Sequence, residues 1–431
     1  MSRLRVIIGL FACPLLVACA RAPAADPARA PAISPAAPAA TASAAVPSAT
    51  TSAGPSQEAA LALHRAAIVV DTHNDVTQRL MVQDVDLSQR LPDGQTDLPR
   101  MRDGGLDAEF LSVFVVPMLY PKDRAYQQAL AQFDAIDKLV AANPDSTVLA
   151  RTSSDVRNAA AAGKTAFLIG VEGGHALGDA SDAELLTRLG EFARRGARYM
   201  TLTWSNSNRL GGSSGDDGKT RGLTPFGKQV VAKMNDLHLL VDISHVSDAS
   251  FFDAVHASKR PVLASHSSAR ALSDHPRNMT DDMLRAVRDN GGAVCVNFGP
   301  QFLDASWAKA EEAAHARAAP EMQSLFAKAS SDPKAAQAGM WKLFGQLAVG
   351  LPRVPASLVI DHIEHIARVA GVDHVCLGSD YDGISIAPAG LDDVSKLPFV
   401  TEELLRRGFS EGDVRKILGE NVLRVLAASE Q

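Results

Sequence analysis

Several histidines and carboxylates stand where short apolar runs of the sequence end. The first such stretch is IVVDTHNDV at residues 68–76, in which an apolar run is followed by His73 and Asp75. Side chains two positions apart point to the same face of an extended chain. One imidazole and one carboxylate on one face supply half of the ligands of a catalytic metal site. The alternative is that the polar residues here only form a turn or start a helix.

The same pattern returns at four later positions. Each follows an apolar run typical of a strand, and the side chains concerned are Glu172, His245, His266 and Asp380. A single histidine at a strand end need not be a ligand. Five strand ends that all carry such residues are difficult to explain by stability alone. We therefore interpret the set as one catalytic site.

The number of these side chains indicates more than one metal ion. Three histidines and two or three carboxylates exceed what one tetrahedral zinc with an open position requires. They suit two ions bridged by a carboxylate and a water, a pair that lowers the pKa of the water and polarises a carbonyl. Glu172 comes between the two groups of histidines in the order of strands, so it is the predicted bridge.

Eight predicted strands, mostly separated by helices, must position these residues. They span residues 68–70, 107–117, 165–171, 197–203, 239–243, 261–264, 293–298 and 374–377. Such alternation implies a parallel sheet. Eight units favour an α/β fold of the closed (β/α)8 type, which carries its active site at the carboxyl ends of the strands. No G-x-G-x-x-G motif follows a strand, which argues against a dinucleotide-binding fold. The Ala-rich segment 302–350 is predicted to be a helical insertion.

The amino-terminal segment has the features of an export and anchoring signal. Two arginines precede an apolar run that is too short to span a bilayer, which predicts a signal peptide over residues 1–18. The run ends in LVAC, which resembles a bacterial lipobox and predicts a lipidated Cys19. An ordinary signal peptide with a chance cysteine is the alternative. Residues 19–56 are mostly Ala, Pro, Ser and Thr and are predicted to be a disordered tether. The expected location is periplasm-facing and lipid-anchored in a Gram-negative bacterium, at the outer membrane because residue 20 is Ala rather than Asp.

The remaining chain, residues 57–431, has a length typical of one barrel domain with an insertion. Hydrophobic residues make up 46% of the sequence, so a sizeable core is expected. The net charge is −6 and no basic block occurs, which argues against a nucleic-acid partner. Cys295 and Cys376 lie in apolar strand-like runs. We predict two buried thiols, with a disulfide as the alternative.

Further motifs resemble one known family. The chain is similar to the membrane dipeptidase (renal dipeptidase) family, peptidase family M19 of the amidohydrolase superfamily. The resemblance covers nearly all of residues 68–426 and rests on the motifs VDTHND, GVEGGHAL, RYMTLTWSN, VDISHVSD, ASHSSARAL, HPRNM, LGSDYDG and GLDDVSKLP. It implies a metallodipeptidase with two Zn²⁺ ions per chain on a (β/α)8 barrel.

The resemblance also implies a role for each strand-end residue. His73 and Asp75 bind one zinc ion, His245 and His266 bind the other, and Glu172 bridges the two. In the implied reaction a metal-bridging hydroxide attacks the peptide carbonyl. Asp380 matches the aspartate that passes the proton to the leaving amine. Orienting a metal ligand is the alternative role of Asp380.

The motif HPRNM is expected to bind the substrate. Arg277 matches the arginine that holds the terminal carboxylate, a task suited to its bidentate guanidinium. A surface arginine that caps a loop is the alternative. Asn278 of the same motif is a further predicted substrate-binding residue. The expected partners are small dipeptides, and the family implies tolerance of a D-residue at the carboxyl end.

One position departs from the family pattern. The strand ending TLT is followed in the family by a histidine that contacts the substrate, and here by Trp204. Tryptophan donates one hydrogen bond and cannot be cationic. Either Trp204 or a neighbour (Asn206 or Asn208) takes over this role, or the substrate differs. His175, next to the predicted bridge, is interpreted as structural or as orienting a ligand.

Two other functions remain open from the sequence. One is a related amidohydrolase that acts on lactams, lactones or N-acyl amino acids. The other is an inactive zinc-containing binding lipoprotein. The insertion is expected either to shape the mouth of the site or to form the contact of a homodimer.

Overall fold

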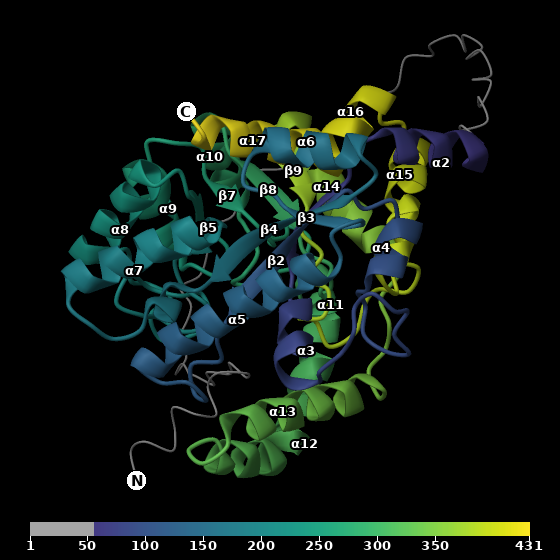
Figure 1. Ribbon diagram of the computed structural model, residues 1–431. Helices are drawn as coiled ribbons and strands as arrows, with labels where there is room; N and C mark the ends of the chain where they lie inside the picture. Colours follow the sequence, from purple (N-terminus) through teal and green to yellow (C-terminus); the bar gives the residue numbers. More distant parts are fainter. Residues whose placement is uncertain (1–55) are drawn as a thin grey trace, which may run out of the picture.

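The computed structural model describes residues 56–431, in which eight parallel strands close into a barrel surrounded by helices (Figure 1). The strands are β1 (Val70–Asn74), β2 (Ala108–Phe114), β4 (Thr165–Glu172), β5 (Ala197–Thr201), β6 (Leu240–Asp242), β7 (Leu263–Ala264), β8 (Ala293–Val296) and β9 (Val375–Leu377). Each pairs with the next, and β9 pairs with β1 to close the ring. This confirms the predicted (β/α)8 barrel. The predicted signal peptide and Cys19 lie outside the described residues.

The sequence analysis missed a ninth strand, β3 (Thr147–Leu149). It pairs with the amino-terminal half of β4. Because β2 also pairs with β4 and closes the ring, β3 is attached to the barrel but is not one of its eight strands. Its three residues are too few to show an alternating or an apolar pattern.

The helices outside the barrel bury one apolar face each. In α7 (Asp182–Arg195) the buried residues Leu185, Leu189 and Phe192 recur at helical spacing. Thr224 caps α8 (Pro225–Asp236), because its hydroxyl accepts a hydrogen bond of 2.9 Å from the backbone N–H of Gly227. The other surrounding helices are α2 (Gln57–Ala66), α3 (Val76–Val82), α4 (Leu98–Asp103), α5 (Asp123–Ala142), α6 (Ser153–Ala161), α9 (Asp248–Ala257), α10 (Asp281–Asn290), α14 (Ser357–Ala370), α15 (Pro398–Arg406) and α16 (Glu411–Arg415).

Alternation along the strands separates the barrel interior from the layer under the helices. In β4, Ala166 and Leu168 belong to the interior cluster, whereas Phe167 and Ile169 pack in the outer layer. The same period of two carries Glu172 to the inner face at the end of this strand. The interior cluster is completed by α17 (Asn421–Ser429), which lies across the end of the barrel that faces away from the insertion (Figure 1).

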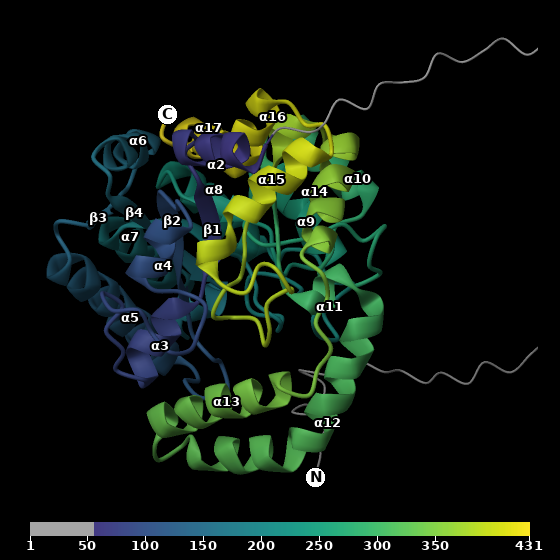
Figure 2. The same ribbon diagram turned by 90° about the vertical axis from the view of Figure 1, so that its right-hand side faces the viewer.

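The insertion forms a helical hairpin across the other end of the barrel. After α11 (Pro300–Leu303), the chain folds into α12 (Ala305–Lys328) and α13 (Pro333–Ala348), which lie side by side (Figure 2). Buried hydrogen bonds attach α13 to the barrel: the amide of Gln337 donates to Gln78 of α3 (2.7 Å) and its carbonyl accepts from Tyr120 (3.1 Å). The hairpin is therefore held against the loop that follows β2.

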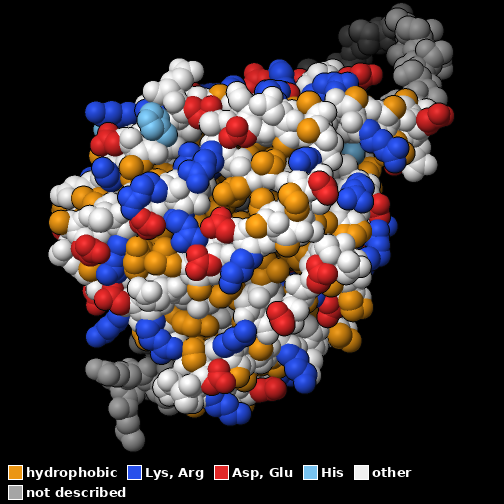
Figure 3. All heavy atoms as spheres, in the orientation of Figure 1, with side chains coloured by type: hydrophobic (Ala, Val, Ile, Leu, Met, Phe, Trp, Pro, Cys, Tyr) orange, Lys and Arg blue, Asp and Glu red, His pale blue; other side chains and the backbone are white. Residues whose placement is uncertain are grey.

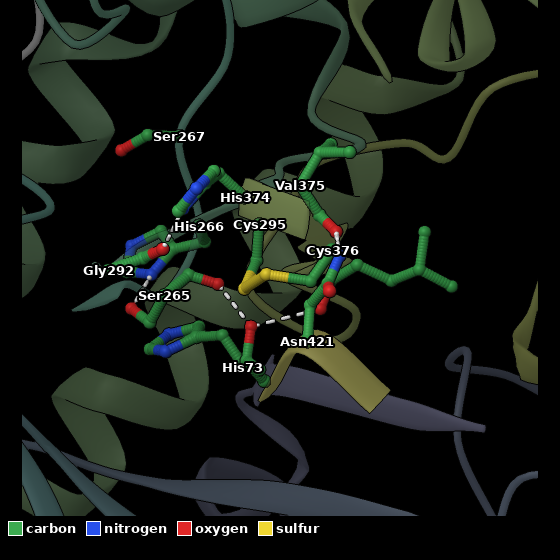
Figure 4. The surroundings of a disulfide bond; sticks show 12 residues. His73, Ser265, His266, Ser267, Gly292, Cys295, His374, Val375, Cys376 and Asn421 are labelled. Carbon is green, nitrogen blue, oxygen red and sulfur yellow. Dashed lines mark hydrogen bonds between the residues drawn. A yellow bond between two sulfur atoms is a disulfide. The ribbon is translucent and has the colours of Figure 1, made fainter. Parts of the chain in front are cut away.

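Cys295 and Cys376 form a disulfide, so the prediction of two thiols is wrong. The two residues are paired in register on the adjacent strands β8 and β9, with a Cα–Cα distance of 4.1 Å. Both are fully buried, and Figure 4 shows His73, Ser265 and His266 on one side of the bond. The sequence places each cysteine on a strand but gives no information on which residues of two strands face each other.

The surface shown in Figure 3 carries basic and acidic side chains intermixed, without a block of one sign. This agrees with the absence of a basic run in the sequence. Among residues 56–431, no helix combines the length and the apolar character needed to cross a bilayer.

We expect the disulfide to stabilise the barrel by constraining the unfolded chain. It links residues 81 positions apart, and removal of a disulfide typically costs about 2–4 kcal/mol, with larger losses for longer loops. The double variant Cys295→Ala and Cys376→Ala should therefore unfold at a lower urea concentration than the oxidised wild type. Titration of thiols in the unfolded wild type, covering residues 56–431, provides the control, and two free thiols per chain would contradict the assignment.

Candidate metal centre and substrate cavity

The predicted ligands meet at the carboxyl ends of the strands. His73 lies in β1 and Asp75 directly follows this strand. Glu172 is the last residue of β4, and His245 and His266 lie just beyond β6 and β7. All five side chains are buried. Asp380, three residues after β9, joins them from the remaining side.

The carboxylate of Glu172 lies between two groups of ligands. Its Oε2 is 3.7 Å from His73 Nε2, while its Oε1 is 2.9 Å from His245 Nε2 and 3.6 Å from His266 Nε2. Asp75 Oδ2 and Asp380 Oδ1 lie on the His73 side, at 3.6 and 3.9 Å from its Nε2. Each oxygen of Glu172 thus faces a different group, as a bridging carboxylate must.

These side chains fit bound metal ions. His73, Glu172 and His266 offer ligand atoms that lie within 4.8 Å of one another, and so do His73, Asp75 and Asp380. Within residues 56–431, the buried atoms His73 Nε2 and Asp75 Oδ1 have no hydrogen-bond partner. Burying three carboxylates in one cluster is costly unless cations compensate them. The donor set of imidazoles and carboxylates is one that zinc accepts.

Two hydrogen bonds fix the tautomers that expose the ligand nitrogens. The Tyr199 hydroxyl donates to the Thr72 carbonyl (3.0 Å), so at 2.8 Å it accepts from Nδ1–H of His73. The Ser265 hydroxyl donates to the Asp242 carboxylate (2.7 Å). At 2.7 Å it therefore accepts from Nδ1–H of His266. In the neutral form of each ring, the Nε2 turned toward the cluster is then unprotonated.

Sequence reasoning missed these supporting residues. Tyr199 requires Gly170 on the neighbouring strand, because a Cβ there would lie 2.0 Å from Cζ of the tyrosine. Alternation places Tyr199 on the inner face of β5, and Ser265 directly precedes a predicted ligand. Both features are visible in the sequence. Only the fold shows that Tyr199 contacts His73 and that Ser265 contacts the ring of His266.

The backbone at the site adopts conformations that side chains usually avoid. His245 and Asp380 have positive φ angles of 66° and 63°. Gly383 has to be glycine for another reason, because a Cβ there would lie 2.2 Å from Asp75 Oδ2 and 2.6 Å from Asp380 Oδ1. Such local strain is typical of functional sites, where the surrounding structure compensates for it.

The charges at the centre attract a cation. Burial lowers the pKa of His73, but the carboxylates of Asp75, Glu172 and Asp380 outweigh this and raise it to about 10. Burial raises the pKa of Glu172 well above its usual range, an effect that His73 partly opposes. Without metal, a proton on His73 is the available counter-charge. A metal ion must displace this proton.

Asp380 has the properties of a proton-transfer group. Burial raises the pKa of its carboxyl to about 6; His73 lowers this pKa and Asp75 raises it. Its Oδ2 accepts a hydrogen bond of 2.8 Å from the Asn297 amide, which leaves Oδ1 facing His73. A carboxyl with a pKa near neutrality and one oxygen directed at the cluster suits a general acid or base.

Arg277 is a buried cation beside the ligands. Its guanidinium donates weakly to the His266 carbonyl (3.2 Å) and the Ser267 hydroxyl (3.4 Å), and its Nε has no partner. No carboxylate of residues 56–431 forms an ion pair with it. Burial lowers the pKa of Arg277 to about 10, so it remains charged. A buried guanidinium in this state is a receptor for an anion.

A cavity of about 1040 Å³ connects the centre to solvent. Asp75, Glu172, His245, Arg277 and Asp380 line its base, and residues of the α12–α13 hairpin line its outer part. The cavity therefore joins the ligand cluster, the buried guanidinium and the insertion in one space.

The remaining predicted residues differ in their positions. Trp204 lines the cavity and packs on Phe114, with ring centroids 4.8 Å apart. The Asn278 amide donates to the carbonyls of Ser273 and Phe302, both at 2.8 Å, and so ties the loop of Arg277 to α11.

The other neighbours considered in the sequence analysis make backbone contacts. The Asn206 amide donates to the Ser207 carbonyl at 3.3 Å, and the Asn208 amide donates to Leu202 at 2.9 Å. His175 bonds the Val115 carbonyl through Nε2 at 2.7 Å, and burial lowers its pKa to about 4. His175 is therefore neutral and structural.

We expect Ser265→Ala to weaken metal binding, because His266 then loses the acceptor that fixes its tautomer. Losses of such supporting groups typically cost about 10–100-fold in affinity. Competition with a chromophoric zinc chelator measures the change. Ser268→Ala is a matched control, since this buried hydroxyl bonds the Asn297 carbonyl (3.3 Å) rather than a predicted ligand. Equal affinities for the wild type and the Ser265 variant would exclude the assigned role.

Comparison with known proteins identifies the family of this chain. The model of the family "Membrane dipeptidase (Peptidase family M19)" matches residues 57–431. Dipeptidase 3 of Rattus norvegicus is 35% identical over 389 residues, which cover 87% of this chain and 68% of that protein. Dipeptidase 3 of Mus musculus is similar to the same extent, with 67% of its length covered.

Solved structures show the same fold. The probable dipeptidase PvdM from Pseudomonas aeruginosa has a TM-score of 0.73 and 25% identity, covering 87% of this chain and 98% of that one. A metallo peptidase from Rhodobacter sphaeroides, liganded with a phosphinate mimic of the dipeptide L-Ala-D-Ala, has a TM-score of 0.67 and 27% identity. The similarity covers 84% of this chain and 99% of that one. The chain therefore belongs to the membrane dipeptidase family, peptidase family M19, and is a metallopeptidase of that family.

Proposed function

We propose that the protein is a binuclear zinc dipeptidase that releases the carboxyl-terminal residue of small dipeptides. The observation that carries this proposal is the Glu172 carboxylate, whose two oxygens face His73 on one side and His245 with His266 on the other. The unpaired guanidinium of Arg277 lies in the same cavity. A bridged metal pair beside a carboxylate receptor suits a substrate with a free carboxyl end.

Two divalent ions held by His73, Asp75, Glu172, His245 and His266 would supply Lewis acidity to activate water and to polarise the scissile carbonyl. The protein's own side chains position the substrate and transfer the proton. Arg277 binds the terminal carboxylate and so fixes which bond lies over the cluster. Asp380 Oδ1 takes a proton from the attacking water and delivers it to the leaving nitrogen. Asn297 holds the other oxygen of Asp380 in place at 2.8 Å.

We expect Trp204 to lower the rate of peptide hydrolysis. It lies in the cavity where the family carries a histidine, and it has a single neutral donor. Loss of one donor to a developing oxyanion typically lowers turnover by about 10²–10³. We therefore propose slower hydrolysis than a histidine at this position would allow, without loss of the metal site.

The proposed substrates include dipeptides with a D-residue at the carboxyl end. The Rhodobacter sphaeroides relative binds a mimic of L-Ala-D-Ala, and this chain resembles it over nearly its whole length. The guanidinium of Arg277 binds a carboxylate of either configuration, because the carboxylate itself is achiral.

We expect zinc-loaded protein to release free amino acids from a panel of L,L- and L,D-dipeptides. Glu172→Gln should abolish hydrolysis and lower the zinc content below two ions per chain, because the amide cannot replace a bridging carboxylate. Amino-acid analysis of the products, together with metal quantification, measures both effects. Two zinc ions per chain with every dipeptide intact would contradict the proposed activity and direct the search to N-acyl amino acids, lactams and lactones.

We also propose that the chain is exported and anchored by a lipid at Cys19, facing the periplasm. The disulfide of β8 and β9 supports an oxidising compartment, since such bonds are rare in the reducing cytosol. Expression in a Gram-negative host should place the wild type in the membrane fraction and Cys19→Ala in the soluble periplasmic fraction. Immunoblots of the separated fractions test this, and a soluble wild type would contradict the anchor.

A further inference from the structure

We propose that the α12–α13 hairpin is the specificity wall of the site and selects a bulky apolar group on the amino side of the scissile bond. This inference rests on the proposed function, since it assumes a substrate held over the metal centre. It assigns the insertion a role in substrate choice.

The volume of the cavity exceeds the needs of a small dipeptide. Pockets for drug-sized ligands measure about 300–1,000 Å³, and this cavity of about 1040 Å³ lies at the top of that range. A dipeptide of two small residues would leave much of it to water. The hairpin residues Met340, Trp341 and Phe344 line the same cavity.

The order of strands gives the orientation of a bound substrate. In the ring of eight strands, three strands separate β2 from β7 in each direction. The ends of β2 and β7 therefore lie opposite each other. Arg277 stays at the end of β7 through its bond to the His266 carbonyl, and Phe114 is the last residue of β2. A substrate with its carboxylate at Arg277 therefore extends its amino side toward Phe114.

The hairpin stands on this opposite side. Gln337 of α13 bonds Tyr120, in the loop after β2, and Gln78 of α3. Phe114 packs against Trp204 (4.8 Å between centroids), and Trp341 packs against Phe344 (5.9 Å). Together these four rings give the amino side of the site an apolar, aromatic wall.

Several charged groups that line the cavity are paired within the protein. Arg79 pairs with Asp93 at 2.5 Å, and Arg353 pairs with Asp392 at 2.6 Å. Glu311 of α12 accepts a hydrogen bond of 3.1 Å from Ser385. With these groups engaged, the aromatic rings of the hairpin favour an aromatic or branched aliphatic group of the ligand over a charged one, while Asp217 and Lys219 line the cavity from the loop after β5.

Calorimetry with two phosphinate dipeptide mimics tests this wall. The mimics share D-Ala at the carboxyl end and carry either Gly or Phe at the amino end. Zinc-loaded wild type should bind the Phe mimic at least about ten-fold more tightly, a ratio typical of added apolar contacts. Trp341→Ala should remove most of this preference while leaving the affinity for the Gly mimic within about two-fold. Trp341→Phe, which keeps an aromatic ring in the hairpin, should retain part of it.

Two further variants complete the experiment. Lys342→Ala is the matched control, since Lys342 is the exposed neighbour of Trp341 and does not line the cavity. It should leave both affinities unchanged. Arg277→Met should weaken both mimics alike, by about ten-fold or more, because it removes the anchor at the shared carboxyl end.

Three results would overturn the inference: equal affinity of the wild type for both mimics, an unchanged preference in Trp341→Ala, or no binding of either mimic to zinc-loaded protein. The mimics are not hydrolysed, so the ratio of the affinities for the Phe and Gly mimics does not depend on turnover. A protein that prefers the Phe mimic but cleaves no dipeptide would refute the proposed activity and still support the wall.

Discussion

The carboxylate of Glu172 can face three histidines only because the barrel closes. His73 comes from the first strand of the barrel and His245 and His266 follow its fifth and sixth strands, and the ring of parallel pairs brings their ends within a few ångströms. The price of this convergence is a buried group of carboxylates that repel one another. Burial and the neighbouring acids raise the pKa of Glu172, and the acids hold a proton on His73. The site is therefore built around a need for positive charge, which bound metal would satisfy.

The supporting residues follow from the same need. A histidine serves as a ligand only if the nitrogen facing the metal is unprotonated, so its other nitrogen must donate to a fixed acceptor. Tyr199 provides this for His73, and Ser265 with Asp242 provides it for His266. Glycine at position 170 leaves room for the Tyr199 ring, and glycine at position 383 leaves room for Asp75 and Asp380. Packing of the barrel interior and chemistry at its mouth are thus parts of one arrangement.

Much of this was accessible from the sequence, for a physical reason. A strand buried on both faces must be apolar, so a polar residue at its end is conspicuous, and the closed parallel barrel places all such ends on one face. That is why the eight strands of the barrel, and the meeting of the predicted ligands at their ends, could be predicted. The register in which two strands pair leaves no comparable pattern in the sequence. The register that brings Cys295 opposite Cys376, the contact between Tyr199 and His73, and the three-residue strand β3 depend on long-range geometry that periodicity does not encode.

Metal chemistry and substrate choice are located in different parts of this chain. The ligands sit on rigid strand ends, where small displacements would destroy the site. Trp341 and Phe344 of the apolar wall sit on an inserted hairpin that contributes nothing to closing the barrel and touches it through side chains such as Gln337. Changes in the hairpin can therefore alter the shape of the outer cavity without disturbing the cluster at its base. Trp204 lies at the border of the two regions: it packs on Phe114 of the wall and its ring centroid is 6.4 Å from that of His245. A substitution at this one position can thus affect the stabilisation of the intermediate and the fit of the substrate together.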